Sequence, residues 1–335
     1  MSILARIFQH FKTEENGSPD PTKAVLLVDF GSPESKEEYK VFLDRILSTP
    51  DLLSPFPPVR WWKKRQILAK RLDAGWQRYL SNGGSPLKRA TGALARGLSA
   101  ALHGTQVGCA YIYGEPQIHD AVAKMAKSGI RELTVLPLHP HSSLLTRTAA
   151  RDALARVPFG LGIPIDVVMP YGEHPFFVTW WKQLVKQAIY ANKMTAPHLL
   201  FVAPSVPKRF AARRDNKFAG EVEASCRTIA LTLGLEWSLA FSSPTQRNAK
   251  WMGPTPEATL DALAKKNVSE ALILPIAFMV ENIVTSTIWG SGLDLSRWPS
   301  MKIARVRLAD GRGPCEAQEE LDGLLYALVQ SAQNG

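Results

Sequence analysis

The sequence has few cysteines and no long hydrophobic run. Its 335 residues include three cysteines, isolated and without CxxC or Cys/His spacing: Cys109, Cys226 and Cys315. We therefore expect no disulfide framework, no zinc site and no iron–sulfur cluster, and we expect the thiols to be buried or unused. The longest apolar runs reach about ten residues, whereas about 20 are needed to cross a bilayer, so no transmembrane helix is expected.

A secretory signal is also missing. The segment MSILARIFQHFK at 1–12 has only a brief apolar patch, and no small-residue cleavage site precedes the polar stretch that follows it. The sequence therefore predicts a cytoplasmic protein, with residues 1–22 as an N-terminal extension.

Nucleotide-binding motifs are absent as well. Neither GxGxxG nor a Walker loop occurs, so we expect no nucleotide ligand. Forty Lys and Arg against thirty Asp and Glu give a net charge of +10, which should attract anions such as nucleic acid, acidic lipid or a polycarboxylate ligand. No nucleic-acid-binding motif accompanies the charge, and we therefore expect no nucleic acid partner.

The chain is globular by composition and alternates strands with helices. Hydrophobic residues make up 45% and charged residues 21%, enough for about two domains with a substantial core. Continuous apolar runs predict strands buried on both faces, as in a parallel sheet; they lie at 24–33, 131–138, 198–207 and 270–276. Helical patterns such as 116–128 and 255–266 precede strands, which is typical of an α/β fold.

The second half of the chain repeats the first. Residues 120–138 align with 258–276 without a gap and share five identical residues, a number that chance similarity between β/α segments could also produce. A second correspondence, in which Pro33 aligns with Pro207, favours a true repeat. We predict two similar Rossmann-like halves at 23–175 and 176–330, each a parallel β-sheet flanked by helices, with ligands bound beyond the carboxyl ends of the strands.

The first half carries 36 more residues than the second between the corresponding prolines, and we place the insertion at about 48–84. This segment contains Trp61 and Trp62 among several Lys and Arg residues. One interpretation is a lip that covers an apolar anionic ligand or makes a peripheral contact with acidic lipid. The other is an ordinary solvated helix whose tryptophans pack inward.

At this point the chain resembles the ferrochelatases. Their conserved blocks are matched in order along nearly the whole chain by LLVDFGSPES at 26–35, NGGSPL at 82–87, AYIYGEPQIHDAVAKMAKSGIRELTVLPLHPHSS at 110–143, FVAPSVP at 201–207, WMGPTPEATL at 251–260 and LPIAFMVENIVT at 274–285. The resemblance implies two Rossmann-like halves with a hydrophobic lip in the first, and an enzyme of haem biosynthesis that inserts ferrous iron into a porphyrin.

The residues that perform this chemistry in the family are replaced. The family block S-A-H-S-L-P assigns proton removal to a histidine, and Pro204 occupies that position here. In the block G-F-x-x-D-H-x-E-T-L, Asn282 stands at the histidine and Val284 at the glutamate, and Ile288 follows one turn later. Glu281 replaces the family's aspartate and is the one acid retained. Phe30 precedes G-x-P in the first block and could stack on a porphyrin ring.

Two histidines could compensate for these losses. His139 and His141 follow a predicted strand, and either could ligate haem iron, act as a base, or be a hydrogen-bonded structural residue. The residues expected to line the tetrapyrrole cleft are Phe30, His139, His141, Pro204, Ser205, Trp251, Phe278, Glu281 and Asn282. Cations that follow the altered block could hold propionates or form a solvated face: Lys208, Arg209, Arg213, Arg214 and Lys217.

Three functional hypotheses follow. The first is a pseudoenzyme that binds haem or porphyrin, as a sensor or carrier, without inserting metal, and has no catalytic residues. The second is an active chelatase that uses His139 or His141 as base and Glu281 as metal ligand. The third is a regulatory partner of a true ferrochelatase that binds no tetrapyrrole. In each case we expect a monomer or a homodimer.

Overall fold

The apolar runs form the strands of two parallel sheets. The structure, a computed structural model, describes residues 20–49, 52–53, 56–81, 83–158, 162–213, 216–242, 251–286, 293–313 and 317–333. In the first sheet the strand order is β2-β1-β3-β4 and all pairs are parallel; the strands are β1 (Lys23–Asp29), β2 (Gln106–Tyr111), β3 (Glu132–Pro137) and β4 (Ile165–Val167). Six of the seven β1 residues are buried, as expected for a central strand covered on both faces.

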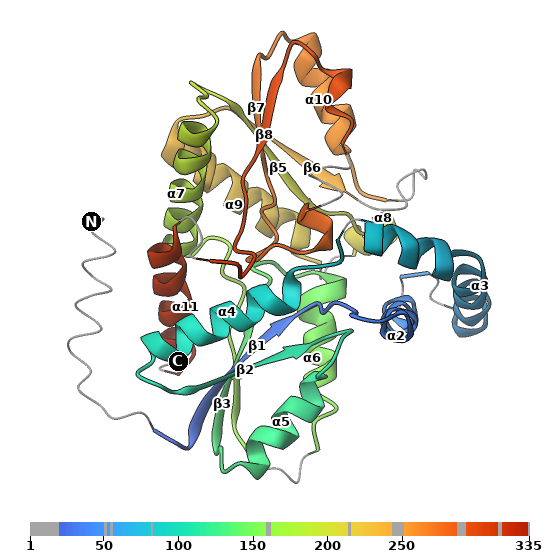
Figure 1. Cartoon of the computed structure of the whole chain (residues 1–335), viewed down its shortest axis with the longest axis vertical. Helices are drawn as coiled ribbons and strands as arrows, with labels where there is room; N and C mark the ends of the chain where they lie inside the picture. The colour runs from blue at the N-terminus through green and yellow to red at the C-terminus, as the bar shows by residue number, and fades with distance from the viewer. Residues whose placement is uncertain are drawn as a thin grey trace.

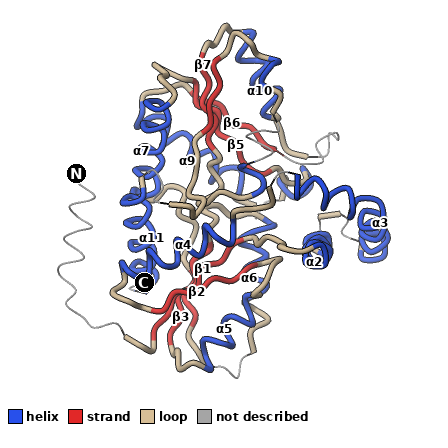
Figure 2. The backbone as a smooth tube through the Cα atoms, in the orientation of Figure 1, coloured by secondary structure: helices blue, strands red, loops and turns tan. Residues whose placement is uncertain are grey.

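The second sheet repeats this arrangement. Its order is β6-β5-β7-β8, again all parallel, and its strands are β5 (His198–Pro204), β6 (Trp237–Ser242), β7 (Glu270–Leu274) and β8 (Lys302–Arg305). Figures 1 and 2 show the second sheet above the first, each with helices beside it. The predicted fold class, two similar Rossmann-like halves, is confirmed.

The gapless repeat is present at the level of whole elements. Helix α5 (Ile118–Lys127) precedes β3, and α10 (Pro256–Lys265) precedes β7. Helix α10 begins 138 residues after α5, and β7 begins 138 residues after β3. Thr255 caps α10 by accepting a hydrogen bond from the Ala258 N–H, and Pro256 at the first turn lacks the N–H that would go unpaired there.

One hydrophobic core joins the two halves. It contains residues from both sheets and from the helices between them, including Leu27, Trp181, Phe201 and Leu325. The helices are α4 (Leu87–Ala101), α7 (Pro175–Ala191), α9 (Phe218–Leu233) and α11 (Gln318–Gln333). Helix α6 (Ala149–Leu154) packs in a separate cluster of the first half. The C-terminal helix α11 packs on α7 and also on α4 and β3 of the first half. The division at residue 175 therefore stays a prediction about sequence units.

The expected insertion contains a long exposed helix. Helix α2 (Lys36–Ser48) is followed by α3 (Pro57–Ser81), whereas the described residues between β5 and β6 hold the short α8 (Lys208–Ala211) and α9. Trp61 and Trp62 on α3 are each 55% exposed, so they do not pack inward. Within the part of the chain that the structure describes, no helix is both long and apolar enough to cross a bilayer. Residues 50–51, 54–55 and 82 of the insertion, and residues 1–19 of the N-terminal extension, lie outside the described residues.

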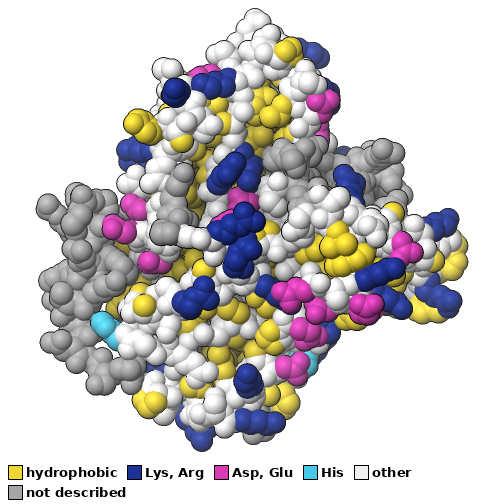
Figure 3. All heavy atoms as spheres, viewed as in Figure 1, with side chains coloured by type: hydrophobic (Ala, Val, Ile, Leu, Met, Phe, Trp, Pro, Cys, Tyr) yellow, Lys and Arg dark blue, Asp and Glu magenta, His cyan; other side chains and the backbone are white. Residues whose placement is uncertain are grey.

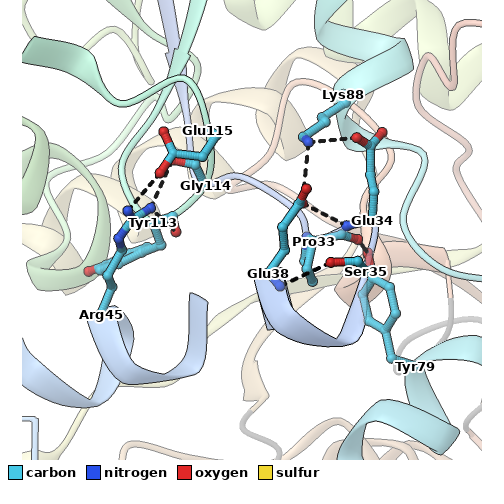
Figure 4. Close-up of polar contacts among 10 residues, drawn as sticks. All are labelled: Pro33, Glu34, Ser35, Glu38, Arg45, Tyr79, Lys88, Tyr113, Gly114 and Glu115. Carbon is cyan, nitrogen blue, oxygen red and sulfur yellow. Dashed lines mark hydrogen bonds and ion pairs between the residues drawn. The ribbon is translucent and has the colours of Figure 1, made fainter. Parts of the chain in front are cut away.

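Two sets of polar contacts tie α2, α3 and α4 to the loops that follow β1 and β2 (Figure 4). On one side, the Tyr79 hydroxyl donates to the Pro33 carbonyl at 3.0 Å, and the Lys88 ammonium lies 2.8 Å from Glu34 Oε2. On the other side, Arg45 of α2 donates to two carbonyls of the loop after β2 and pairs with Glu115 at 2.6 Å. The root of the insertion is therefore fixed to the loops that follow β1 and β2.

The two cysteines that the structure describes are buried or half-buried thiols. Cys226 is buried, and Cys109 is half-buried with its pKa raised to about 11 because burial disfavours the thiolate. Neither is in a disulfide. Cys315 lies outside the described residues.

Gly31, in the block at 26–35, lies where the loops that follow β1 and β2 pack closely, so a substitution there tests this packing. Gly31 has φ +101, and a Cβ there would lie 2.7 Å from the Gly114 nitrogen. We predict that Gly31→Ala lowers the free energy of unfolding by about 1–3 kcal/mol. Gly220→Ala in α9 is the control: nothing lies within 4 Å of its Cβ, so it should raise that free energy by about 0.5–1 kcal/mol. Chemical denaturation measures both, and equal effects would contradict the prediction.

Candidate functional site

The carboxyl ends of strands from both halves meet at the segment 139–142. This segment follows β3 of the first half. The His139 ring lies edge-on to Phe278, which follows β7 of the second half, with 6.2 Å between ring centroids. Ser142 contacts α9, also of the second half. The segment is thus part of the seam between the halves, where ligands bind in open α/β folds.

His139 lies inside this seam. It is 4% exposed, and neither ring nitrogen has a hydrogen-bond partner. Its Nε2 lies 3.5 Å from Oδ1 of Asp29, the last residue of β1. Burial, with a smaller contribution from the Arg147 cation, lowers the pKa of His139 to about 3. The imidazole is therefore neutral near pH 7 and keeps one nitrogen lone pair.

Asp29 shares the buried environment. Burial raises its pKa to about 7, against the opposing effect of the hydrogen bond that its Oδ1 accepts from the Phe30 N–H at 2.6 Å. As the pH falls below about 7, the Asp29 carboxyl therefore becomes protonated while the His139 imidazole stays neutral. Sequence analysis did not single out Asp29, although an acid inside the apolar run LLVDF was a signal for it.

His141 and Ser142 connect the seam to α9. The Ser225 hydroxyl donates to the Glu221 carbonyl, so His141 Nε2 donates to Ser225 Oγ at 2.9 Å. Ser142 donates its N–H and its hydroxyl to the Glu221 carboxylate at 2.6 and 3.0 Å. Burial lowers the pKa of His141 to about 3, so it also is neutral. Through these hydrogen bonds, His141 and Ser142 of the first half are linked to α9 of the second half.

An arginine that sequence analysis missed supports the same segment. Arg147, on the helical turn that follows, donates to the His139 carbonyl at 2.8 Å and to the Val168 carbonyl at 2.6 Å. Its guanidinium also lies 5.4 Å from the centre of the Tyr171 ring. Nothing in the local sequence separates this arginine from a surface cation, because its partners are main-chain carbonyls distant along the chain.

Phe30 belongs to an aromatic cluster at the end of β1. Its ring lies 4.7 Å from Tyr113, after β2, and 5.8 Å from Phe42 of α2. Phe30 is half-buried, so part of the ring remains exposed. The cluster connects the root of the insertion to the seam and offers an aromatic surface of the kind that stacks on flat macrocycles.

In the altered block at the end of β5, polar groups are hydrogen-bonded to main-chain carbonyls. Pro204 ends β5 and is half-buried. The Ser205 N–H donates to the Ser242 carbonyl at 2.7 Å, and its hydroxyl donates to the Met252 carbonyl at 2.9 Å. The neighbouring Trp251 is half-buried, and its backbone forms an antiparallel β-bridge with Pro207. Ser205 is therefore satisfied inside the loop.

Of the cations after this block, Arg209 reaches the insertion, where it donates to the Leu52 carbonyl at 3.1 Å. Lys208, Arg213 and Lys217 are exposed. Arg214 lies outside the described residues.

Asn282 caps the turn that follows β7. Its Oδ1 accepts hydrogen bonds from the Val284 and Thr285 N–H groups at 2.8 and 3.2 Å, and its own N–H donates to Thr285 Oγ1 at 2.9 Å. This reciprocal arrangement satisfies the first N–H groups of a helical turn. Val284 is half-buried against the apolar core of the second half. Ile288 lies outside the described residues.

Both carboxylate oxygens of Glu281 are engaged in contacts within the protein. Its Oε1 pairs with Arg305 of β8 at 2.7 Å and accepts the Leu308 N–H at 2.9 Å, while Oε2 accepts the Thr285 hydroxyl at 2.5 Å. Glu281 is 5% exposed, so these contacts compensate the charge in a dry environment. Within the described parts of the chain, no three His, Cys, Asp or Glu side chains gather in a metal-binding arrangement.

A cavity adjoins the segment 139–142, since Pro140 and Glu221 are among its lining residues. It has a volume of about 610 Å³ and lies between the segment 166–174 and α11. Asp166, Glu173 and Glu221 line it, together with apolar side chains. Three carboxylates would repel the propionates of a tetrapyrrole, so this cavity does not fit such a ligand.

Comparison with known proteins agrees with the blocks in the sequence. The ferrochelatase family profile matches residues 22–287. A ferrochelatase of Synechococcus sp. strain RCC307 is 31% identical over 279 residues, which cover 78% of this chain and 70% of the relative. A ferrochelatase of Aquifex aeolicus is 30% identical over 271 residues, covering 78% of this chain and 85% of the relative.

A solved structure shares the fold. The structure described as SirB from Bacillus subtilis with Fe3+ superposes with a TM-score of 0.56 at 12% identity, covering 93% of this chain and 98% of SirB. At this identity the likeness shows the architecture alone.

The buried ion pair gives a testable consequence. We predict that Glu281→Ala lowers the free energy of unfolding by about 3–5 kcal/mol, because it leaves Arg305 without its buried partner. Glu223→Ala is the control, since Glu223 pairs with Arg227 at the same 2.7 Å on an exposed surface and should change stability by less than about 1 kcal/mol. Urea denaturation measures both. A small effect of Glu281→Ala would mean that this carboxylate is not structural.

Proposed function

Because this chain belongs to the ferrochelatase family, we propose that it binds haem or a porphyrin at the seam between its halves without inserting metal. Such a protein would act as a haem sensor or carrier. Phe30 and Phe278 supply aromatic surface from the two halves, and the cations after β5 supply charge for propionates.

The joint replacement of the reactive groups carries this proposal. Metal insertion requires a base for two pyrrole N–H protons and ligands for a dehydrated cation. Pro204 has no titratable group, and Val284 has no ligand atom. Asn282 uses its oxygen to cap a turn, and both Glu281 oxygens are engaged by Arg305, Leu308 and Thr285. The positions that would carry the reaction thus hold structural contacts.

The rival hypothesis is an active chelatase that uses His139 or His141 with Glu281. His141 directs Nε2 to Ser225, and Glu281 would have to leave its ion pair to bind a cation. Both contacts weigh against this mechanism. The third hypothesis, a regulatory partner of a true ferrochelatase, requires that no tetrapyrrole binds, and it is separated from the first by the titration described next.

We predict a shifted Soret band and a 1:1 endpoint when the purified protein is titrated with haemin. In an anaerobic assay, insertion of Fe(II) into protoporphyrin and coproporphyrin should not exceed the rate without protein. The Aquifex aeolicus ferrochelatase serves as the positive control. Turnover that disappears in the His139→Ala, His141→Ala double variant would favour the rival hypothesis. A flat haemin titration would remove the binding proposal and leave the regulatory one.

We also propose that α3 rests on an anionic membrane surface. Phe56, Trp61 and Trp62 are 67%, 55% and 55% exposed at its amino-terminal end, and the Arg65 guanidinium lies 4.8 Å from the Trp61 ring centre. Figure 3 shows hydrophobic and basic side chains side by side on the projection at the right, where α3 is drawn in Figure 1. Aromatic rings with flanking cations are the composition that binds the interface of acidic bilayers.

The membrane proposal predicts that a Trp61→Ala, Trp62→Ala double variant loses at least about tenfold in affinity for anionic vesicles, since burying one such side chain contributes about 1.5–3 kcal/mol. Tyr190→Ala is the control, because Tyr190 is 88% exposed on α7, away from the insertion. Co-sedimentation with phosphatidylserine vesicles gives the affinities. Equal loss in both variants, or no binding by the unchanged protein, would contradict the proposal.

A further inference from the structure

The His139 imidazole is the polar group at the seam that the fold itself leaves least satisfied. Six buried side-chain nitrogen or oxygen atoms among the described residues have no hydrogen-bond partner, and two of them are the ring nitrogens of His139. Buried polar atoms are nearly always paired, because leaving them unpaired costs free energy. The residue therefore calls for an explanation beyond packing, and its place at the ends of β1 and β3 suggests a ligand.

Asp29 gives this imidazole the environment of a metal-binding histidine. Metal-ligating histidines commonly donate the second ring N–H to a carboxylate, which fixes the tautomer and raises the basicity of the ligating nitrogen. Asp29 Oδ1 lies 3.5 Å from His139 Nε2, both groups are buried, and the ring is neutral. Nδ1 is then the nitrogen with a lone pair to offer.

We infer that His139 would ligate haem iron in the proposed site through Nδ1, with Asp29 beside Nε2. This inference rests on the proposed function. It also predicts that the site distinguishes haem from metal-free porphyrin, since only the iron complex gains this bond. Asp29 is a positioning residue, because it acts through the imidazole.

His141 does not fit this role as well. Its Nδ1 is also unpaired, but its Nε2 donates to the Ser225 hydroxyl rather than to a carboxylate. A Cβ on Gly172 would lie 2.5 Å from that Nε2, so the backbone closes that side of the ring. Its ring also lies edge-on to the buried Phe177. His139 instead lies edge-on to Phe278, a half-buried side chain of the other half. Because His139 is 4% exposed, the proposed ligation requires a neighbouring side chain to move, and we assign this movement to Phe278.

The test uses the full chain with haemin and with metal-free protoporphyrin. We expect resonance Raman and electron paramagnetic resonance spectra of the wild-type haem complex to show ligation by a neutral imidazole. His139→Ala should lose this signature and at least about tenfold in haemin affinity, while its affinity for metal-free protoporphyrin stays within about twofold. Added imidazole should restore the signature. Asp29→Asn should keep nitrogen ligation and weaken haemin binding about tenfold, as outer partners of metal ligands do.

His198→Ala is the matched control. His198 is a half-buried histidine at the opposite end of β5, hydrogen-bonded to Ser238, and its removal should leave haemin affinity and spectra unchanged. Phe278→Ala should speed haemin association, because the covering ring is gone. An unchanged rate would show that this ring does not control access.

The outcomes separate the inference from the proposed function. If the wild-type protein binds neither haemin nor protoporphyrin, the proposed function fails. If it binds both but the haem complex shows no nitrogen ligand, or if His139→Ala keeps the wild-type signature, the inference is wrong and the binding proposal stands. Should His139→Ala fail to fold, the wild-type spectrum and the Asp29→Asn shift still decide the question.

Discussion

The contact between segment 139–142 and the second half is the constraint on which the site depends. Ser142 and His141 donate hydrogen bonds to Glu221 and Ser225 of α9, and His139 meets Phe278. These bonds form in a buried region, where a lost partner would leave a polar group without water. They join the two halves beside the carboxyl ends of β1 and β3, together with the shared hydrophobic core.

The same physical rule explains the altered catalytic positions. A buried carboxylate row is costly unless it is paired or bound to metal. In this chain the retained acid, Glu281, is neutralised by Arg305, and Asn282 and Val284 serve a helix cap and an apolar core. These contacts are the basis for the proposal that the positions no longer carry metal insertion. The seam retains aromatic surface and two neutral imidazoles, to which the proposed function assigns the binding of a flat macrocycle.

Much of the fold could be predicted because it follows from local patterns. Continuous apolar runs predicted buried parallel strands, and the gapless alignment of 120–138 with 258–276 predicted two like units. Counting residues between matched prolines gave a position for the insertion. The exposure of Trp61 and Trp62 could not be predicted in this way, since an amphipathic pattern does not say what covers a face. The site was predicted less completely: Asp29, Arg147 and Ser225 were missed, because their partners are distant in sequence.

The sequence by itself determined the four strands at the centres of the sheets, the family and the residues that stand at the family's reactive positions, because these depend on local spacing and residue type. Only the tertiary structure decided what those residues contact. Whether Glu281 faces a cation or Arg305, and which ring nitrogens of His139 and His141 stay unpaired, depends on groups brought together by the folded chain. Burial and distance are properties of the packed chain, and they set the protonation state of Asp29 and His139.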